Sequence, residues 1–308
     1  MSVVEQALRF ADESGHLLAI VGPTASGKTS LAVALAEKLG GEVVSADSVQ
    51  IYRAFDAGSG KPTGDELARA PHHLVSALDP LDPIDAAAWA ERALDRVAQI
   101  RARGRVPIVC GGTFLWVKVL RFGLAGAPPA SERIRDRHRT IAGTEGRSAL
   151  HVQLGAVDPE AAAKLHPNDL VRVSRALEVF ELSGKTLTAW QREHAFARVR
   201  HPTRLLALAH DQPTLTQRIQ SRVASWLSQG WIEEVESLVA RGYGASRAMG
   251  SVGYSQVNAM LKGDLARADL EEAIVRATRV FARRQRTWLR DADVTWLTGD
   301  FRRTELDL

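Results

Sequence analysis

A phosphate-binding loop is the feature whose residue types and spacing most directly imply chemistry. The segment GPTASGKT fits the pattern G-x-x-x-x-G-K-[ST] and lies between an apolar run and a helical run. Backbone N–H groups and the positive end of the following helix bind phosphate oxygens in such a loop, whether the ligand is a nucleotide or another diphosphate. Lys28 supplies a point charge to the outer phosphates, and the Thr29 hydroxyl helps to hold Mg2+. The loop consists of Gly22, Pro23, Thr24, Ala25, Ser26, Gly27, Lys28 and Thr29.

Two further candidate residues follow predicted strands. Asp47, in the segment SADSVQIY, is expected to project toward the phosphate loop. A carboxylate there can hold magnesium, cap a turn or take a proton from a nucleophile, and position alone does not choose between cap and catalyst. Thr113, in GGTFLWVK, stands where a nucleotide hydrolase often has an acidic residue. A hydroxyl stabilises negative charge more readily than it binds metal, which argues against an ATPase; a helix N-cap is the alternative role.

The elements that must position these residues alternate between strands and helices. Apolar runs predict strands at residues 17–21, 42–45 and 106–110, and helical patterns occupy residues 30–39 and 86–103. The order β-α-β-α-β predicts an α/β fold of the P-loop NTPase-like kind, with a doubly wound parallel sheet. Ligands of such sheets bind at the carboxyl ends of the strands, where the candidate residues above all fall.

A change of composition in the middle of the chain predicts a second domain. The segment GLAGAPP, residues 123–129, breaks the alternating pattern, and the following stretch reads as short helices. We therefore expect a P-loop core formed by residues 1–124 and 199–308, with a helical insertion at residues 125–198. The core resumes with a return strand near residue 203 and a long helical region broken at Gly230.

Arginines are concentrated on one predicted helix near the carboxyl end. From residue 273 to 290 there are six arginines and no acidic residue. Without interleaved carboxylates such a stripe favours contact with a phosphate backbone over an ordinary solvated cationic face. The arginines that share one helical face are Arg276, Arg279, Arg283, Arg286 and Arg290. The expected packing face consists of Ile274, Ala277, Phe281 and Trp288.

Composition restricts the class of protein. With 45% hydrophobic and 25% charged residues the chain resembles an ordinary globular protein, and its formal charge of +4 permits a polyanionic partner. No apolar stretch approaches the roughly 20 residues that span a bilayer, and no secretion signal is visible, so a cytoplasmic protein is expected. The single cysteine, Cys110, lies in an apolar strand and is expected to be a buried structural thiol.

A set of motifs in fixed order resembles one family. In chain order they are GPTASGKT, DSVQIY, GSGKPT, PHHL, GGTFLWVK, HPND, RALEVF, SGKTLT, VGYSQ and RRQRTWLR. The set resembles the tRNA dimethylallyltransferase family, also called tRNA isopentenyltransferases, over nearly the whole chain. The chain lacks zinc-knuckle cysteines and so resembles the bacterial form. The departures are Val171 where glutamine is common, Ser255 where a basic residue is common, and Trp116 where tyrosine is usual.

The resemblance implies a prenyl transfer to RNA. A dimethylallyl group moves from dimethylallyl diphosphate to the exocyclic N6 amine of adenosine-37, 3′ of a tRNA anticodon, and diphosphate is released. By resemblance Asp47 takes the amine proton, while Lys28, Thr113, Arg222 and Thr29 with Mg2+ stabilise the departing diphosphate. Gln50 is implied to face the Watson–Crick edge of the base. A cytoplasmic monomer is expected.

The resemblance also implies a set of tRNA-binding residues. They lie after the second and third strands, in the helical insertion and on the arginine-rich helix, where basic side chains would hold the RNA backbone. The set consists of Asp47, Ser48, Val49, Gln50, Thr113, Arg135, Val171, Arg172, Val173, Ser174, Arg175, Arg283 and Arg286.

Other functions remain as alternatives. An ATP-dependent small-molecule or nucleotide kinase would use the same loop, with the insertion as a lid, but leaves the arginine stripe and the motif set unexplained. A nucleic-acid-binding NTPase switch needs hydrolysis that the turn at Thr113 does not visibly support. No aspartate-rich DDxxD pair is present, which argues against a synthase of longer terpenoid chains.

Overall fold

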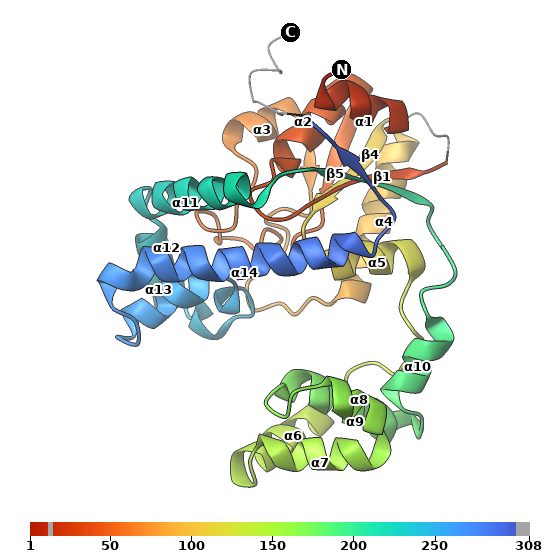
Figure 1. Cartoon of the computed structure of the whole chain (residues 1–308), viewed down its shortest axis with the longest axis vertical. Helices are drawn as coiled ribbons and strands as arrows, with labels where there is room; N and C mark the ends of the chain where they lie inside the picture. Colours follow the sequence, from red (N-terminus) through yellow and green to blue (C-terminus); the bar gives the residue numbers. More distant parts are fainter. Residues whose placement is uncertain (12–14, 300–308) are drawn as a thin grey trace. The chain divides into compact units, whose positions relative to one another are not determined.

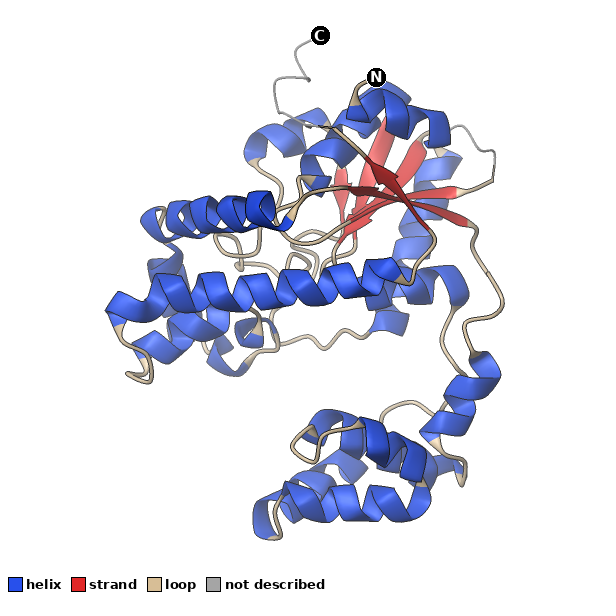
Figure 2. Ribbon diagram, viewed as in Figure 1, coloured by secondary structure: helices blue, strands red, loops and turns tan. Residues whose placement is uncertain are grey.

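The computed structural model describes residues 1–11 and 15–299 and divides the chain into two compact units (Figure 1). Met1–Arg121 and His201–Leu308 form the core unit, and Phe122–Arg200 form the insertion unit. Figure 2 shows strands only in the core unit, whereas the insertion unit consists of helices and loops. Among the described residues, no helix combines the length and the apolar character needed to cross a membrane.

The core unit contains a six-stranded parallel sheet, which confirms the predicted fold class. The strand order is β3-β2-β4-β1-β5-β6, and every neighbouring pair is parallel. The strands are β1 (Leu17–Val21), β2 (Gly41–Ser45), β3 (His72–His73), β4 (Val106–Gly111), β5 (Thr203–Leu208) and β6 (Val294–Leu297). The sequence predicted β1, β2, β4 and β5 but not the short edge strands β3 and β6.

Both faces of the sheet are covered by helices. Leu18 and Ile20 of β1 pack against α1 (Val3–Ala11) and α2 (Lys28–Leu39), while Ala19 and Val21 belong to the larger core on the other face. Alternate residues of one strand thus enter two different cores, as expected for a doubly wound sheet. The helices that contribute to the larger core are α4 (Ala86–Ala102), α5 (Phe114–Phe122), α11 (Gln212–Ser228), α12 (Trp231–Ala240), α13 (Tyr254–Leu261) and α14 (Leu270–Arg290).

The phosphate loop follows from the local sequence between β1 and α2. Gly27 adopts a φ of 87°, a left-handed conformation that glycine reaches without strain, and α2 begins at the next residue. The helix therefore starts two residues earlier than its hydrophobic pattern indicates, and Lys28 and Thr29 lie in its first turn. The positive end of α2 consequently points into the loop.

The packing face of α14 was predicted incorrectly in part. Ile274 is buried as expected, but Phe281 is 41% and Trp288 37% exposed. The buried line instead includes Thr278 and Gln285, two polar residues whose hydrogen bonds are satisfied inside the protein. Because those positions are polar, hydrophobic periodicity alone selects a line of residues rotated around the helix. The complete buried line is Leu270, Ile274, Val275, Thr278, Ala282, Gln285 and Leu289.

The insertion unit has a small hydrophobic core of its own. Leu150 and Leu154 of α7 (Arg147–Val157) pack against Val173 and Leu177 of α9 (Leu170–Ser183), and all four side chains are buried. The remaining helices of the unit are α6 (Glu132–Thr144), α8 (Pro159–Lys164) and α10 (Leu187–His194). The unit is thus a compact helical body within the boundaries given above.

Candidate active site

A pocket of about 810 Å³ lies at the carboxyl ends of β1, β2 and β4, within the core unit. This is the expected ligand position for a parallel sheet. The phosphate loop, the segment after β2 and Thr113 after β4 all line it, together with residues of α11 and α14 that the sequence places far away. We call it the reaction pocket. The residues predicted to carry chemistry that line it are Lys28, Thr29, Asp47, Ser48, Val49, Gln50, Thr113 and Arg222.

Two desolvated cations face the phosphate loop. Burial lowers the pKa of Lys28, and the positive charge of Arg222 lowers it further, while Asp47 acts in the opposite direction. Burial also lowers the pKa of the Arg222 guanidinium to about 10, against a raising effect of Asp47. Among the described residues, the carboxylates that line the pocket are Asp47 and Glu66, fewer than its lysines and arginines, and Arg222 Nε is buried without a hydrogen-bond partner. The pocket is therefore short of negative charge and suited to an anion.

Asp47 caps a turn and also lines the reaction pocket. Its Oδ1 accepts hydrogen bonds from the backbone N–H groups of Val49, at 2.9 Å, and Gln50, at 3.2 Å. Both recorded bonds go to the same oxygen, so the cap fixes the direction of the carboxylate. The two roles that the sequence left open, cap and catalyst, are compatible in one side chain.

Thr113 connects the turn after β2 to the turn after β4. Its hydroxyl accepts the backbone N–H of Ser48 at 3.0 Å, and its own N–H donates to the carbonyl of Ala46 at 3.1 Å. Its carbonyl accepts the N–H of Trp116, which places Thr113 at the start of α5. The close approach requires glycine at position 111, where a Cβ would lie 2.2 Å from the Ala46 carbonyl oxygen. Thr113 therefore fixes the segment that carries Asp47.

Gln50 makes hydrogen bonds within the protein on both sides of its amide. Its amide Nε2 donates to the Gly60 carbonyl at 2.7 Å, and its Oε1 accepts from the Ser45 hydroxyl at 3.1 Å. The donor and the acceptor are thus both engaged within the protein. Gln50 holds the glycine-bearing loop at residues 58–61 over the pocket, and contact of its amide with an adenine stays a prediction.

Gln285 is a residue that sequence reasoning missed. Its Oε1 accepts the backbone N–H of Thr24 at 2.8 Å, and its Nε2 donates to the Gly112 carbonyl at 2.9 Å. The side chain is only 5% exposed, and it joins the phosphate loop to the β4–α5 turn. The signal available in the sequence was a glutamine inside an arginine-rich helix. The structure adds that this glutamine is buried, and buried amides are rare unless they are hydrogen-bonded.

A second missed group supports the loop at residues 56–61. The Glu234 carboxylate accepts the backbone N–H of Ala57 at 2.7 Å and the Tyr254 hydroxyl at 2.7 Å. The same hydroxyl accepts the N–H of Gly58 at 3.1 Å. Burial raises the pKa of Tyr254 above its ordinary value, so it remains a hydrogen-bond donor. These contacts join the sequence motifs GSGKPT and VGYSQ, which lie almost two hundred residues apart.

Cys110 is a structural residue, as predicted. Its thiol is buried in β4, and burial raises its pKa to about 12. A thiol with so high a pKa is not a nucleophile at neutral pH. Its Sγ lies 3.6 Å from the backbone carbonyl oxygen of Lys28, so the residue packs behind the phosphate loop.

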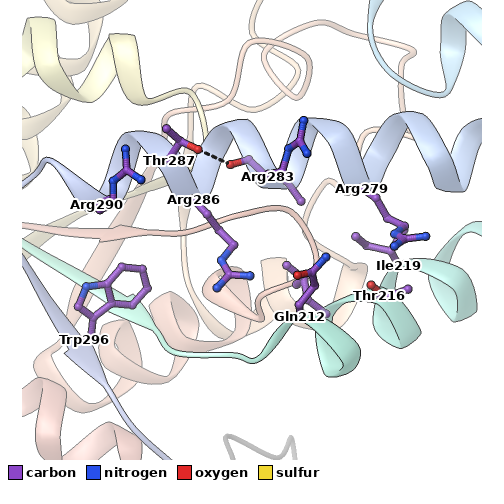
Figure 3. A pocket seen from close by; sticks show the side chains of 11 residues that line it. Gln212, Thr216, Ile219, Arg279, Arg283, Arg286, Thr287, Arg290 and Trp296 are labelled. Atoms are coloured by element: carbon purple, nitrogen blue, oxygen red, sulfur yellow. Dashed lines mark hydrogen bonds between the residues drawn. The ribbon is translucent and has the colours of Figure 1, made fainter.

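A groove rich in arginine lies on another face of α14. Its volume is about 480 Å³, and Figure 3 shows the arginine side chains with Trp296 of β6 and polar residues of α11 around it. Thr278, Phe281 and Gln285 of α14 line the reaction pocket, whereas residues on a neighbouring face of the same helix line this arginine groove. Its arginines are Arg279, Arg283, Arg286 and Arg290, which include both predicted tRNA contacts of α14.

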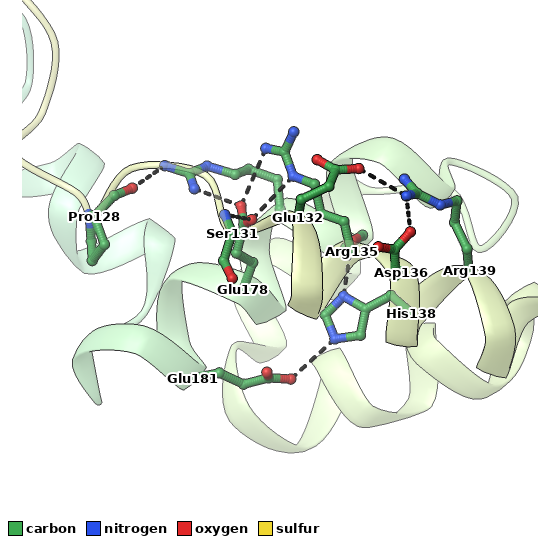
Figure 4. Close-up of polar contacts among 11 residues, drawn as sticks. Pro128, Ser131, Glu132, Arg135, Asp136, His138, Arg139, Glu178 and Glu181 are labelled. Carbon is green, nitrogen blue, oxygen red and sulfur yellow. Dashed lines mark hydrogen bonds and ion pairs between the residues drawn. The ribbon is translucent and has the colours of Figure 1, made fainter.

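In the insertion unit, two predicted tRNA contacts are held by an internal carboxylate (Figure 4). The fully buried Glu178 accepts from Arg135 at 3.0 Å, from Arg175 at 2.6 Å and from the backbone N–H of Ser131 at 2.6 Å. Arg175 also donates to the Pro128 carbonyl at 2.7 Å. Both arginines keep part of their surface exposed, 37% and 29% of the side chain.

The predicted tRNA segment at residues 171–175 divides into exposed and buried positions. Val171 is 80% exposed and the Arg172 side chain 74%, so both are accessible. Val173 is fully buried in the core of the unit, and the Ser174 hydroxyl bonds His138 Nδ1 at 2.8 Å inside it. The structure contradicts side-chain contacts from these two residues, because they lie on the inward face of α9.

Comparisons with known proteins match this arrangement. A family model described as IPP transferase matches residues 50–292. The tRNA dimethylallyltransferase of Sorangium cellulosum is 64% identical over 283 residues, covering 92% of this chain and 90% of the relative. That of Myxococcus xanthus is 47% identical and covers 89% of each chain. The chain belongs to the tRNA dimethylallyltransferase family.

Solved structures of the family share the fold. The full-length tRNA isopentenylpyrophosphate transferase of Bacillus halodurans has a TM-score of 0.69 and 33% identity, over 96% of this chain and 94% of its own. A eukaryotic dimethylallyltransferase captured acting on tRNA has a TM-score of 0.71 at 24% identity, over 93% of this chain and 75% of its own. The resemblance inferred from the motifs is confirmed, and the kinase alternative is not favoured.

Removal of the Gln285 amide should weaken anion binding by this tRNA dimethylallyltransferase family member. Gln285→Ala leaves the Thr24 N–H and the Gly112 carbonyl unpaired, at about 1–3 kcal/mol each. We expect at least about a tenfold loss of affinity for inorganic diphosphate, measured by titration calorimetry. Gln285→Glu keeps an acceptor for Thr24 but loses the donor to the Gly112 carbonyl and adds a negative charge, so it should lose at least as much. Gln99→Ala, at an exposed position of α4, is the control; equal affinities for all variants would contradict the clamp.

Glu178 should stabilise the insertion unit in a pH-dependent manner. Burial acts to raise its pKa, but hydrogen bonds from Arg175, Ser131 and Arg135 outweigh burial and lower it. The stabilisation is therefore complete above the ordinary glutamate pKa of about 4.3 and is lost as pH falls through the lower folded value. Glu178→Gln should cost about 1–3 kcal/mol at pH 7, because the arginines remain partly exposed.

Thermal unfolding of the full chain measures this effect between neutral pH and pH 3. Below pH 4 the wild-type protein should approach the stability of the Glu178→Gln variant. Glu160→Gln removes a carboxylate that is 43% exposed and also paired with basic side chains, and it should leave the stability nearly unchanged. A Glu178→Gln variant as stable as wild type at pH 7 would rule out the proposed contribution.

Proposed function

We propose that this chain transfers the dimethylallyl group of dimethylallyl diphosphate to the N6 amine of adenosine-37 in tRNA, with release of diphosphate. The observation that carries the proposal is the pair of buried cations, Lys28 and Arg222, that faces the phosphate loop beside the Asp47 carboxylate. Relatives that cover most of the chain bear the name tRNA dimethylallyltransferase. The arrangement supplies what a displacement of diphosphate needs, an anion cradle beside a proton acceptor.

The amine requires a base because its lone pair is delocalised into the purine ring. As the N6–C1 bond forms, the C1–O bond breaks, the bonding electrons leave with the diphosphate, and the amine proton passes to Asp47. The turn cap on Oδ1 holds the carboxylate in a fixed direction, and Thr113 fixes the backbone that carries it. The protein thus prepares the base before the substrate arrives.

Charge on the departing diphosphate is met by fixed donors. Lys28 Nζ and the Arg222 guanidinium lie beside the loop, and Arg222 Nη2 donates to the Thr24 hydroxyl, which orients it. In a desolvated pocket such donors stabilise developing charge far more than they would in water. Burial lowers the pKa of both cations, and a bound diphosphate would raise it.

Magnesium fits the residues of the pocket. The Thr29 hydroxyl and the Asp47 carboxylate line it and are hard oxygen ligands. Among the described residues no group of three or more metal-binding side chains occurs, which suits an ion held mainly by diphosphate oxygens and water. We propose Thr29 as its protein ligand. When bound, the ion would neutralise part of the leaving-group charge.

Surfaces for tRNA are available on both units. The four arginines of the arginine groove and the exposed Arg172 of the insertion unit are proposed to hold the RNA backbone. Phe281 lines the reaction pocket and is 41% exposed, so it offers an aromatic face on which an extruded adenine can stack. We also propose a monomer, and a tRNA substrate suits a cytoplasmic location.

Transfer of label distinguishes this function from a kinase. With labelled dimethylallyl diphosphate and tRNA, label should enter RNA; with γ-labelled ATP it should not. Asp47→Asn should lower the transfer rate by about 100- to 1000-fold, because it removes the proton acceptor but preserves the turn cap. Asp95→Asn, on the exposed face of α4, is the control. Label reaching RNA only from ATP would overturn the proposal.

Salt dependence tests the RNA contacts separately from the chemistry. Affinity for tRNA should fall steeply between 50 and 200 mM salt, because bound cations are released from the phosphate backbone. Arg286→Ala should weaken binding and reduce the slope of log affinity against log salt by about 1. Arg284→Ala, on the same helix but outside the arginine groove, should leave the slope unchanged. Filter binding or fluorescence anisotropy measures both, and identical slopes would exclude Arg286 as a phosphate contact.

A further inference from the structure

One side of the reaction pocket is apolar and aromatic. Val223, Trp226 and Trp231 line it from α11 and α12, together with the backbone of residues 58–60. We call this side the aromatic wall. It has no part in the roles assigned above, since neither indole is a base, a cation or a magnesium ligand. A buried apolar surface inside an anion-binding pocket calls for an apolar group on the ligand.

The aromatic wall is rigid. Trp226 packs edge-to-face on Trp231 with ring centroids 5.5 Å apart. Trp231 is only 1% exposed and is wedged against Gly58 and Gly253, where an added Cβ would lie 1.9 Å and 2.1 Å from its ring. A Cβ on Gly60 would lie 3.4 Å from the Trp226 ring. Trp226 is therefore closed in from behind and cannot retreat without displacing other residues.

The aromatic wall adjoins the diphosphate cradle directly. Arg222 and Trp226 are four residues apart on α11, and the guanidinium lies 4.5 Å from the centre of the indole ring. The same guanidinium donates to Thr24 in the phosphate loop. One arginine thus contacts both the phosphate loop and the aromatic ring. A group attached to the bound diphosphate begins its path beside Trp226.

The geometry of the displacement directs the carbon chain to this wall. The attacking nitrogen, C1 and the departing oxygen are in line, so the rest of the allylic chain projects sideways from C1. The side of Asp47 and Thr113 would be taken by the amine, and the side where the Ser30 hydroxyl bonds Glu66 at 3.0 Å is polar. The aromatic wall is the apolar side that remains at the cradle.

We propose that the aromatic wall binds the carbon chain of the allylic diphosphate and that Trp226 limits this chain to a single isoprene unit. This inference rests on the proposed function. Geranyl diphosphate carries the same allylic C1–O bond and would react by the same exchange, with the N6–C1 bond formed, diphosphate released and the proton passed to Asp47. Its additional isoprene unit would collide with the indole of Trp226.

The test compares two donors in the same preparation. Purified wild-type protein and Trp226→Ala are assayed with tRNA and either dimethylallyl or geranyl diphosphate, and the modified nucleoside is identified by mass spectrometry. We expect the ratio of kcat/KM for geranyl over dimethylallyl diphosphate to rise at least about tenfold in Trp226→Ala. The kcat/KM for dimethylallyl diphosphate should fall, because apolar contact is lost.

Control variants distinguish a specific effect of the aromatic wall from a nonspecific effect of substitution on folding or activity. Trp226→Phe, which opens less space, should give an intermediate ratio and serves if Trp226→Ala does not fold. Phe281→Ala removes another aromatic side chain of the pocket and should raise the KM for tRNA but leave the donor ratio unchanged. Trp288→Ala, outside the pocket and 37% exposed, should change neither.

The outcomes distinguish the two proposals. No transfer from dimethylallyl diphosphate by the wild-type protein would overturn the proposed function. Transfer by the wild-type protein, together with an unchanged donor ratio in both folded Trp226 variants, would overturn only the limit on chain length. A ratio that rises equally in Phe281→Ala would place the carbon chain elsewhere in the pocket and would also contradict the proposal.

Discussion

The imbalance of charge at the phosphate loop is the constraint on which the rest of the structure depends. Two cations have been taken out of water, and the nearby Asp47 carboxylate compensates them only in part. Burial of incompletely paired cations is costly, and the arrangement becomes favourable when an anion binds there. The fold tolerates the cost because α2, α11 and the β2 turn are each fixed by independent packing in the larger and smaller cores. Packing in the two cores thus offsets the cost of keeping incompletely paired charges in the pocket.

The phosphate loop owes its shape as much to distant helices as to its own glycines. Gln285 of α14 holds both the loop and the turn after β4, and Arg222 of α11 reaches the Thr24 hydroxyl. Glu234 and Tyr254 fix the loop that Gln50 holds from the other side. The carboxyl-terminal helices are therefore parts of the active site and not an appendage to the sheet. Since the arginine groove uses another face of α14, contacts with RNA backbone need not disturb this clamp.

Sequence reasoning succeeded where the signal is local. The strands β1, β2, β4 and β5 are short apolar runs bounded by turn residues, and the phosphate loop has a fixed spacing of glycine, lysine and threonine. The motifs placed Asp47 and Thr113 on one pocket because the carboxyl ends of parallel strands share an edge. The edge strands β3 and β6 were missed because they are too short to show alternation.

What the sequence could not show are the contacts between residues that are distant along the chain. Gln50 carries the same amide whether it faces a base or the carbonyl of Gly60, and only the fold decides between them. Arg135 and Arg175 resemble surface arginines until Glu178 is found between them. The packing face of α14 was misjudged because two of its buried residues are polar, which no hydrophobic pattern detects.

The packing of Trp231 against two glycines restricts which substitutions this chain can accept during evolution. The indole fills the space that side chains at positions 58 and 253 would need, and position 253 also has a φ of 92°, which disfavours any residue except glycine. A methyl group at either glycine demands a smaller residue at 231, and a smaller residue at 231 leaves a void beneath Trp226. Substitutions at positions 58, 231 and 253 are therefore coupled. A change at one of them alone would disturb the packing of the aromatic wall.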